Sequence, residues 1–143
     1  NFLFAVPLLL IFMYICGVTP GLEMLTLPVV ILVELTFVLG LGLALSALNV
    51  YYRDIQHILA NLITLWFFLC PIIYPASNVP EKLRFTLWLN PVALFTEMYQ
   101  GIFVDNSWPQ WEILVLTGAI SLITLIVGAM IFERYRDNFA ELI

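Results

Sequence analysis

The chain has 143 residues, of which 63% are hydrophobic and 10% are charged, and its mean hydropathy is +1.04. About 25% of the residues of a soluble domain are charged, so this composition excludes an ordinary soluble fold and indicates an integral membrane protein. The net charge of −5 comes from ten acidic and five basic residues. Nucleic-acid binding requires clustered lysine and arginine, so we expect membrane lipid, and no nucleic acid, as a partner.

Four apolar segments divide the chain. A helix needs about 20 apolar residues to cross a hydrocarbon core of about 30 Å, and we predict spans over residues 1–16, 25–50, 55–74 and 111–132. Pro71 and Pro75 remove backbone donors and predict a kink or stop near the end of the third span. The first segment begins inside an apolar run, without Met and without a polar entry, so we expect a longer protein whose N-terminal part is missing. The predicted fold class is an all-α integral membrane protein with four transmembrane helices.

The segment between the last two spans is too apolar for an ordinary surface loop. Residues 76–109 carry Pro80, Pro91 and Pro109, with apolar residues at helical spacing between them. Irregular backbone that protein does not cover cannot lie in lipid, so we predict two short helices that lie at, or re-enter, the membrane interface. Residues 133–143 are predicted to form a cytoplasmic tail, because the positive-inside rule favours that side by three basic residues to two.

Glu34 is an acidic residue deep inside the second predicted span, where a charge is costly and usually faces a partner or a wet cavity. At 100° per residue, one side of this helix carries Glu34, Gly42, Asn49 and Arg53. The opposite side carries a row of small residues suited to close helix packing, Gly40, Ala44 and Ala47. The polar side either lines a transport pathway or joins helices through hydrogen bonds, and both interpretations stay open.

Two further spans carry polar residues at helical spacing. In the third span these are His57, Asn61, Thr64 and Phe68, which either line a conduit for a polar substrate or lie at the interface. The last span has a stripe of small and polar residues, for which close packing is the expectation: Thr117, Ser121, Thr124 and Gly128. The chain has a single histidine, which leaves no zinc-ligand set, so no metal site is predicted.

The sequence lacks the signatures of nucleotide hydrolysis. The run Gly40-Leu41-Gly42 has no phosphate-loop lysine and lies in a predicted span. The carboxylates are scattered rather than paired, and no Ser-His-Asp arrangement is recognisable. We therefore predict no enzymatic activity and no cofactor in this chain, and energy for uphill transport would have to come from another subunit.

Four motifs follow one another around the third span. They are Tyr51-Tyr52-Arg53-Asp54, Pro71-Ile72-Ile73-Tyr74-Pro75, Asn78-Val79-Pro80 and Leu89-Asn90-Pro91. In this order and at this spacing the chain resembles the membrane subunit of type-2 ABC exporters. Within that family it is most similar to the polysaccharide branch, which exports O-antigen, capsule or teichoic-acid chains on lipid carriers.

The resemblance implies a single permease domain over residues 1–143 that holds the last four of six spans. It also implies a homodimer in the bacterial cytoplasmic (inner) membrane, joined to two nucleotide-binding ABC ATPase subunits that bind ATP and Mg²⁺. Residues 78–104 would correspond to gate helices outside the cytoplasm. The gate candidates are Asn78, Pro80, Trp88, Asn90, Pro91 and Tyr99. Aromatic residues along the pathway would support a sugar chain, although lipid contact is the favoured role for any single one. These aromatic candidates are Trp66, Phe67, Phe68, Tyr74 and Tyr99.

Two details qualify what the resemblance implies. Family members often carry a Tyr-Arg pair where this chain has Tyr99-Gln100, so no role of that arginine transfers. Arg53 and Asp54 lie at a cytoplasmic helix junction, where they either fix the turn by capping and ion pairing, which we favour, or contact the ATPase.

The function expected from the resemblance is ATP-driven export of lipid-linked polysaccharide. The alternatives are an exporter of drugs or other small amphiphiles and a membrane scaffold without a transport role. A membrane enzyme acting on lipid-linked sugars is the least favoured, since it would need convergent acids or a metal set at one interface.

Overall fold

The structure is a computed structural model that describes residues 2–15, 17, 21–51, 55–72, 80 and 84–136. Every regular element in these ranges is a helix, in agreement with the predicted all-α class. The elements are α1 (Phe2–Ile15), the 3₁₀ helix η1 (Leu22–Thr26), α2 (Leu27–Tyr51), α3 (Ile55–Leu69), α4 (Arg84–Trp88), α5 (Pro91–Phe103) and α6 (Trp111–Arg136).

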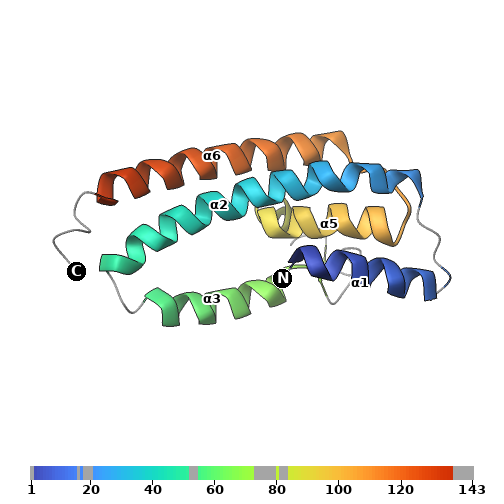
Figure 1. Cartoon of the computed structure of the whole chain (residues 1–143), viewed down its shortest axis with the longest axis horizontal. Coiled ribbons are helices and arrows are strands. Elements are labelled where there is room, and N and C mark those ends of the chain that lie inside the picture. The colour runs from blue at the N-terminus through green and yellow to red at the C-terminus, as the bar shows by residue number, and fades with distance from the viewer. Residues whose placement is uncertain are drawn as a thin grey trace.

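The helices α2 and α6 lie side by side and run in the same direction (Figure 1). The stretch Leu22–Val50, which joins η1 to α2, and α6 itself are each long and apolar enough to cross a membrane. The predicted second and fourth spans are therefore helices. α6 continues to Arg136, so the predicted tail begins as helix, and its two terminal arginines suit the negative end of the helix dipole.

The short helix α1 ends where the sequence predicts a turn. Gly17 has a φ of +76°, a left-handed conformation that glycine adopts without steric cost. Its N–H donates a hydrogen bond to the Tyr14 carbonyl over 3.1 Å. This contact ends the helix after Ile15, close to the predicted limit of the first span.

The helix α3 stops at Leu69, before the predicted end of its span at residue 74. Pro71 explains the difference, because a proline disfavours helical geometry in the residue before it, here Cys70. Its 15 residues correspond to about 22 Å of helix, less than the ~30 Å hydrocarbon core. The part of the prediction that reaches Tyr74 lies outside the described residues.

Two short helices, α4 and α5, occupy the region predicted to contain two. The side chain of Asn90 caps α5, since its Oδ1 accepts a hydrogen bond from the Val92 N–H over 3.1 Å. Pro91 follows as the first helical residue, where a proline is well tolerated. α5 runs beside the first half of α2 in the opposite direction (Figure 1).

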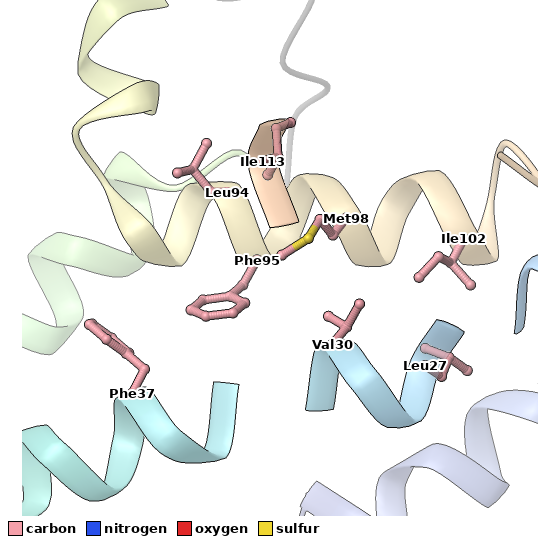
Figure 2. Close-up of a cluster of buried hydrophobic side chains, with 8 residues drawn as sticks. All are labelled: Leu27, Val30, Phe37, Leu94, Phe95, Met98, Ile102 and Ile113. Carbon is pink, nitrogen blue, oxygen red and sulfur yellow. The ribbon is translucent and has the colours of Figure 1, made fainter. Parts of the chain in front are cut away.

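The main hydrophobic core joins α2, α5 and α6. Figure 2 shows its eight buried residues: Leu27, Val30, Phe37, Leu94, Phe95, Met98, Ile102 and Ile113. Phe37 lies toward Phe95 and Leu27 toward Ile102, as expected for antiparallel helices (Figure 2). The rings of Phe37 and Phe95 are tilted, with centroids 5.9 Å apart. This core fixes the position of α5 against the two long helices.

The contact between α2 and α6 is made by small residues. A Cβ added to Gly128 would overlap the Gly40 carbonyl, and one added to Gly40 would meet the backbone of Leu125 at 2.5 Å. Ala47, Thr117 and Ser121 are also buried. The predicted close packing of both small-residue stripes is confirmed at these positions.

Large apolar side chains cover the outside of the described helices. They are exposed along α2, α3 and α6, for example Leu32, Ile63 and Ile126. In water such a surface would be unstable, whereas lipid or another apolar chain would cover it. This protein is a membrane protein.

Candidate functional site

A groove of about 390 Å³ lies between α2, α3 and α5. We call it the α2/α3/α5 groove. Its lining comprises Glu34, Phe37, Val38, Leu41, Ile63, Trp66, Phe67, Cys70, Ile72, Val92, Phe95, Thr96 and Tyr99. Val38, Ile63 and Phe67 are exposed, so the groove opens to the surface of the chain. Its wall is mainly apolar and aromatic, with one carboxylate.

Glu34 and Tyr99 provide the polar contact in this groove. The Tyr99 hydroxyl donates a hydrogen bond to a Glu34 carboxylate oxygen over 2.5 Å, and both residues are half-buried. The ring of Tyr99 stacks on Phe103, with centroids 6.3 Å apart. Glu34 therefore joins α2 to α5 and also lines the groove, so the two interpretations of its role are compatible. Its role in transport remains a prediction.

Asn90 connects the start of α5 to the end of α3. Its Oδ1 accepts a hydrogen bond from the Trp66 indole N–H over 2.8 Å, in addition to the Val92 N–H. Its Nδ2 donates to Cys70 Sγ over 3.3 Å. One side chain thus caps α5 and holds two residues of the α3 end.

Gln100 provides a second connection between α5 and the α3 end. Its Nε2 donates a hydrogen bond to the Pro71 carbonyl over 2.8 Å. This amide stands at the position where the resemblance implies an arginine, and it uses its donor to satisfy a carbonyl in the turn after α3. Asn90 and Gln100 together tie α5 to the residues that follow the Pro71 stop.

The predicted polar face of α3 does not line this groove. His57, Asn61, Thr64 and Phe68 are exposed on α3, and the groove is lined by Ile63 and other α3 residues instead. The Thr64 hydroxyl donates to the Ala60 carbonyl, four residues earlier. The role of this face in lining a conduit for a polar substrate stays a prediction.

Of the remaining predicted residues, the structure describes three and leaves four outside the described ranges. Asn49 is half-buried on α2, and its Oδ1 has no hydrogen-bond partner among the described residues. Pro80 and Trp88 are exposed. Four candidates lie outside the described residues: Arg53, Asp54, Tyr74 and Asn78.

Sequence reasoning missed the roles of Trp66, Cys70 and Gln100 as partners around α5. Trp66 is one of the aromatic pathway candidates, but nothing in the sequence indicates its bond with Asn90. Cys70 looks like an ordinary apolar residue of a span. The Asn90-Pro91 pair was a usable signal, because Asn before Pro predicts a helix N-cap whose side chain can also accept other bonds.

Comparison with known proteins identifies the family of this chain. The ABC-2 type transporter family matches residues 1–104, which include α1 to α5. This chain belongs to the ABC-2 type transporter family. The match covers the Glu34–Tyr99 contact and the connections of Asn90 and Gln100, whereas α6 follows it in the chain. No solved structure matches the chain.

Several ABC-2 relatives carry the name O-antigen export system permease protein RfbA. The one from Myxococcus xanthus is 40% identical over 143 residues, which cover 99% of this chain and 55% of the relative. Two from Klebsiella pneumoniae are 28% and 29% identical over 146 residues, which cover all of this chain and 55% of each relative. The chain thus spans about half the length of the curated relatives that it matches.

Proposed function

We propose that this chain is part of the transmembrane subunit of an ATP-binding cassette exporter that moves lipid-linked, O-antigen-like polysaccharide across the bacterial cytoplasmic membrane. Separate nucleotide-binding subunits drive the transport. The observation that carries the proposal is the 40% identity to an O-antigen export permease over 99% of the chain.

The proposed topology has four spans, with α4 and α5 as gate helices between the last two. α2 and α6 meet the length requirement by themselves. α1 and α3 are shorter, and α3 is followed by the turn that Gln100 and Asn90 hold against α5. A span in which a short helix is followed by a turn suits a transporter, because irregular backbone is tolerated at membrane depth where it is buried in protein or lines a water-filled cavity. In the proposed exporter, two copies of the permease form a homodimer.

The α2/α3/α5 groove supports a conformational role for α5. On the α2 side, α5 is held by the Glu34–Tyr99 hydrogen bond and by apolar contacts such as Phe37 with Phe95. Displacing α5 from α2 would break that hydrogen bond and widen the groove. ATP-driven closure of the partner subunits would supply the work for this displacement.

Reconstitution of the complete permease with its ATPase subunits tests the proposal. Vesicles would be loaded with lipid-linked glycan, and translocation would be read as ATP-dependent exposure of the glycan to an added lectin. We expect the permease and the ATPase to form a stable complex, and we expect the glycan to change its rate of ATP hydrolysis. The matched control is the same complex with an ATPase variant that binds but does not hydrolyse ATP.

Two outcomes would reject the proposed function. A permease that binds no ABC ATPase would lose its energy source. A complex that hydrolyses ATP and moves a small fluorescent amphiphile, but never exposes the glycan, would be an exporter of small amphiphiles rather than of polysaccharide.

A further inference from the structure

A second hollow lies on α5, formed by residues other than those that line the α2/α3/α5 groove. It has a volume of about 130 Å³ and lies between the second half of α5, the loop after it and the start of α6. We call it the α5/α6 pocket. Among the residues of α5, Phe95 and Tyr99 line the groove, whereas Glu97 and Gly101 line the pocket. The two hollows therefore present different chemistry.

The lining of the α5/α6 pocket combines one indole with several polar groups. Its polar members are Glu97, Asp105, Ser107 and Gln110. Trp108 adds an aromatic wall and is itself exposed, and the buried residues Met98 and Ile113 form its apolar part. Glu97 is half-buried.

The loop that carries Trp108 is held against the end of α5. The Ser107 N–H donates to the Gly101 carbonyl over 2.9 Å, and the Ser107 hydroxyl donates to the same oxygen over 3.2 Å. The Val104 N–H donates to the Gln100 carbonyl over 2.8 Å. These bonds hold the loop in place, so the wall of the pocket is formed before any ligand arrives.

The chemistry of the lining selects among ligand classes. Carboxylates accept hydrogen bonds and do not donate, so Glu97 and Asp105 require a ligand with donors such as hydroxyl groups. Their charges disfavour an anion. A metal ion is a poor fit, because the described residues contain no group of three or more His, Cys, Asp or Glu side chains. The face of an indole attracts the weakly positive C–H groups of a sugar ring.

The size of the pocket restricts the ligand further. Pockets for drug-sized ligands measure about 300–1,000 Å³, and this one is about 130 Å³. A pocket of this size suits a single ring that contacts the protein on one side only. We propose that the α5/α6 pocket binds one neutral sugar residue of the glycan, with Trp108 against the ring face and Glu97 and Asp105 accepting from its hydroxyl groups. This inference rests on the proposed function and specifies its substrate contact.

Saturation-transfer NMR on the complete permease–ATPase complex in nanodiscs tests this inference. The probes are the methyl glycosides of glucose, galactose, mannose and rhamnose, with methyl glucuronide as an anionic comparison. We expect saturable binding of at least one neutral glycoside. Trp108→Ala should weaken it about tenfold, a loss typical of one aromatic contact plus area. Glu97→Gln should weaken it severalfold and reduce the discrimination against methyl glucuronide.

Matched controls come from the start of α6. Trp111 and Glu112 are exposed and do not line the pocket, so Trp111→Ala and Glu112→Gln should leave glycoside binding unchanged. Co-purification with the ATPase reports whether each variant folds. If Trp108→Ala does not fold, Trp108→Leu keeps an apolar side chain and removes the aromatic face.

The inference is overturned if no glycoside binds saturably to the wild-type complex, or if the control variants lose as much binding as the pocket variants. These outcomes are separate from a failure of the proposed function, which appears as absent glycan translocation by the wild-type complex. The binding assay uses free glycosides and requires no transport.

Discussion

The α2–α6 contact and the α3–α5 contact are built differently. α2 and α6 approach so closely at Gly40 and Gly128 that no side chain separates their backbones. α3 and α5 are joined by the side chains of Asn90 and Gln100, beside an open groove. A glycine contact loses no rotamer freedom and has no side chain that can rearrange, whereas a side-chain hydrogen bond can change partners. We expect movement around the groove and little movement between α2 and α6.

The largest expected effect comes from closing the space at the α2–α6 contact. In Gly128→Ala the new methyl group meets the Gly40 backbone, which cannot move aside as a side chain can. We expect a loss of about 3 kcal/mol of stability, the upper end for overpacking, read as a lower melting temperature in detergent. Gly118→Ala is the control, since its methyl group would meet no atom of the described residues within 4 Å. Equal melting temperatures for the two variants would remove the distinction between the contacts.

The next effect concerns the start of α5. Asn90→Ala removes the helix cap and the contacts with Trp66 and Cys70, at a cost of about 2 kcal/mol. Hydrogen exchange should show faster exchange of the first amides of α5. Asn90→Asp keeps the oxygen that caps the helix and accepts from Trp66, so it should lose much less. If Asp and Ala behaved alike, the Cys70 contact rather than the cap would dominate.

The Glu34–Tyr99 contact should have a smaller effect on stability. Tyr99→Phe removes the donor and leaves a half-buried carboxylate without this bond, at a cost of about 1–2 kcal/mol. Glu34→Gln keeps an acceptor oxygen and should cost less. Thermal melting compares stability, and the translocation assay compares function. A Glu34→Gln protein with wild-type transport would leave this residue with a packing role only.

The smallest effect is expected at Gln100. Gln100→Ala removes one hydrogen bond to the Pro71 carbonyl, worth about 1 kcal/mol. Gln56→Ala, on the exposed surface of α3, serves as the reference. Hydrogen exchange at the amides of Cys70 and Ile72, on either side of Pro71, measures the change. Unchanged exchange there would show that Asn90 alone holds the α3 end.

The sequence predicts the long helices well, because a continuous apolar run with clear stop signals determines where α2 and α6 lie. The helix α3 ends at Leu69, which agrees with the kink or stop that Pro71 predicts inside the third apolar segment. Small residues at helical spacing correctly predicted close packing on α2 and on α6, and the structure shows that the two helices pack on each other at Gly40 and Gly128. That pattern is local and needs no knowledge of the partner.

The groove could not be predicted in the same way. Glu34 and Tyr99 are 65 residues apart, and Trp66 and Asn90 are 24 apart, so no periodicity relates them. Both Glu34 and Tyr99 were nevertheless candidates, one from its cost in lipid and the other from the family resemblance. Among the α3 residues that line the groove, Trp66 and Phe67 are aromatic pathway candidates, whereas composition does not distinguish Ile63 from residues that face lipid.

The position of the glycine contact along α6 has a mechanical consequence. Gly128 lies 17 residues after Trp111 and 8 residues before Arg136, which correspond to about 26 Å and 12 Å of helix. If α6 pivots as a straight rod about this point, its Trp111 end travels roughly twice as far as its Arg136 end. A small tilt imposed near Arg136 is therefore amplified at the opposite end, where Ile113 packs on α5 and borders the α5/α6 pocket.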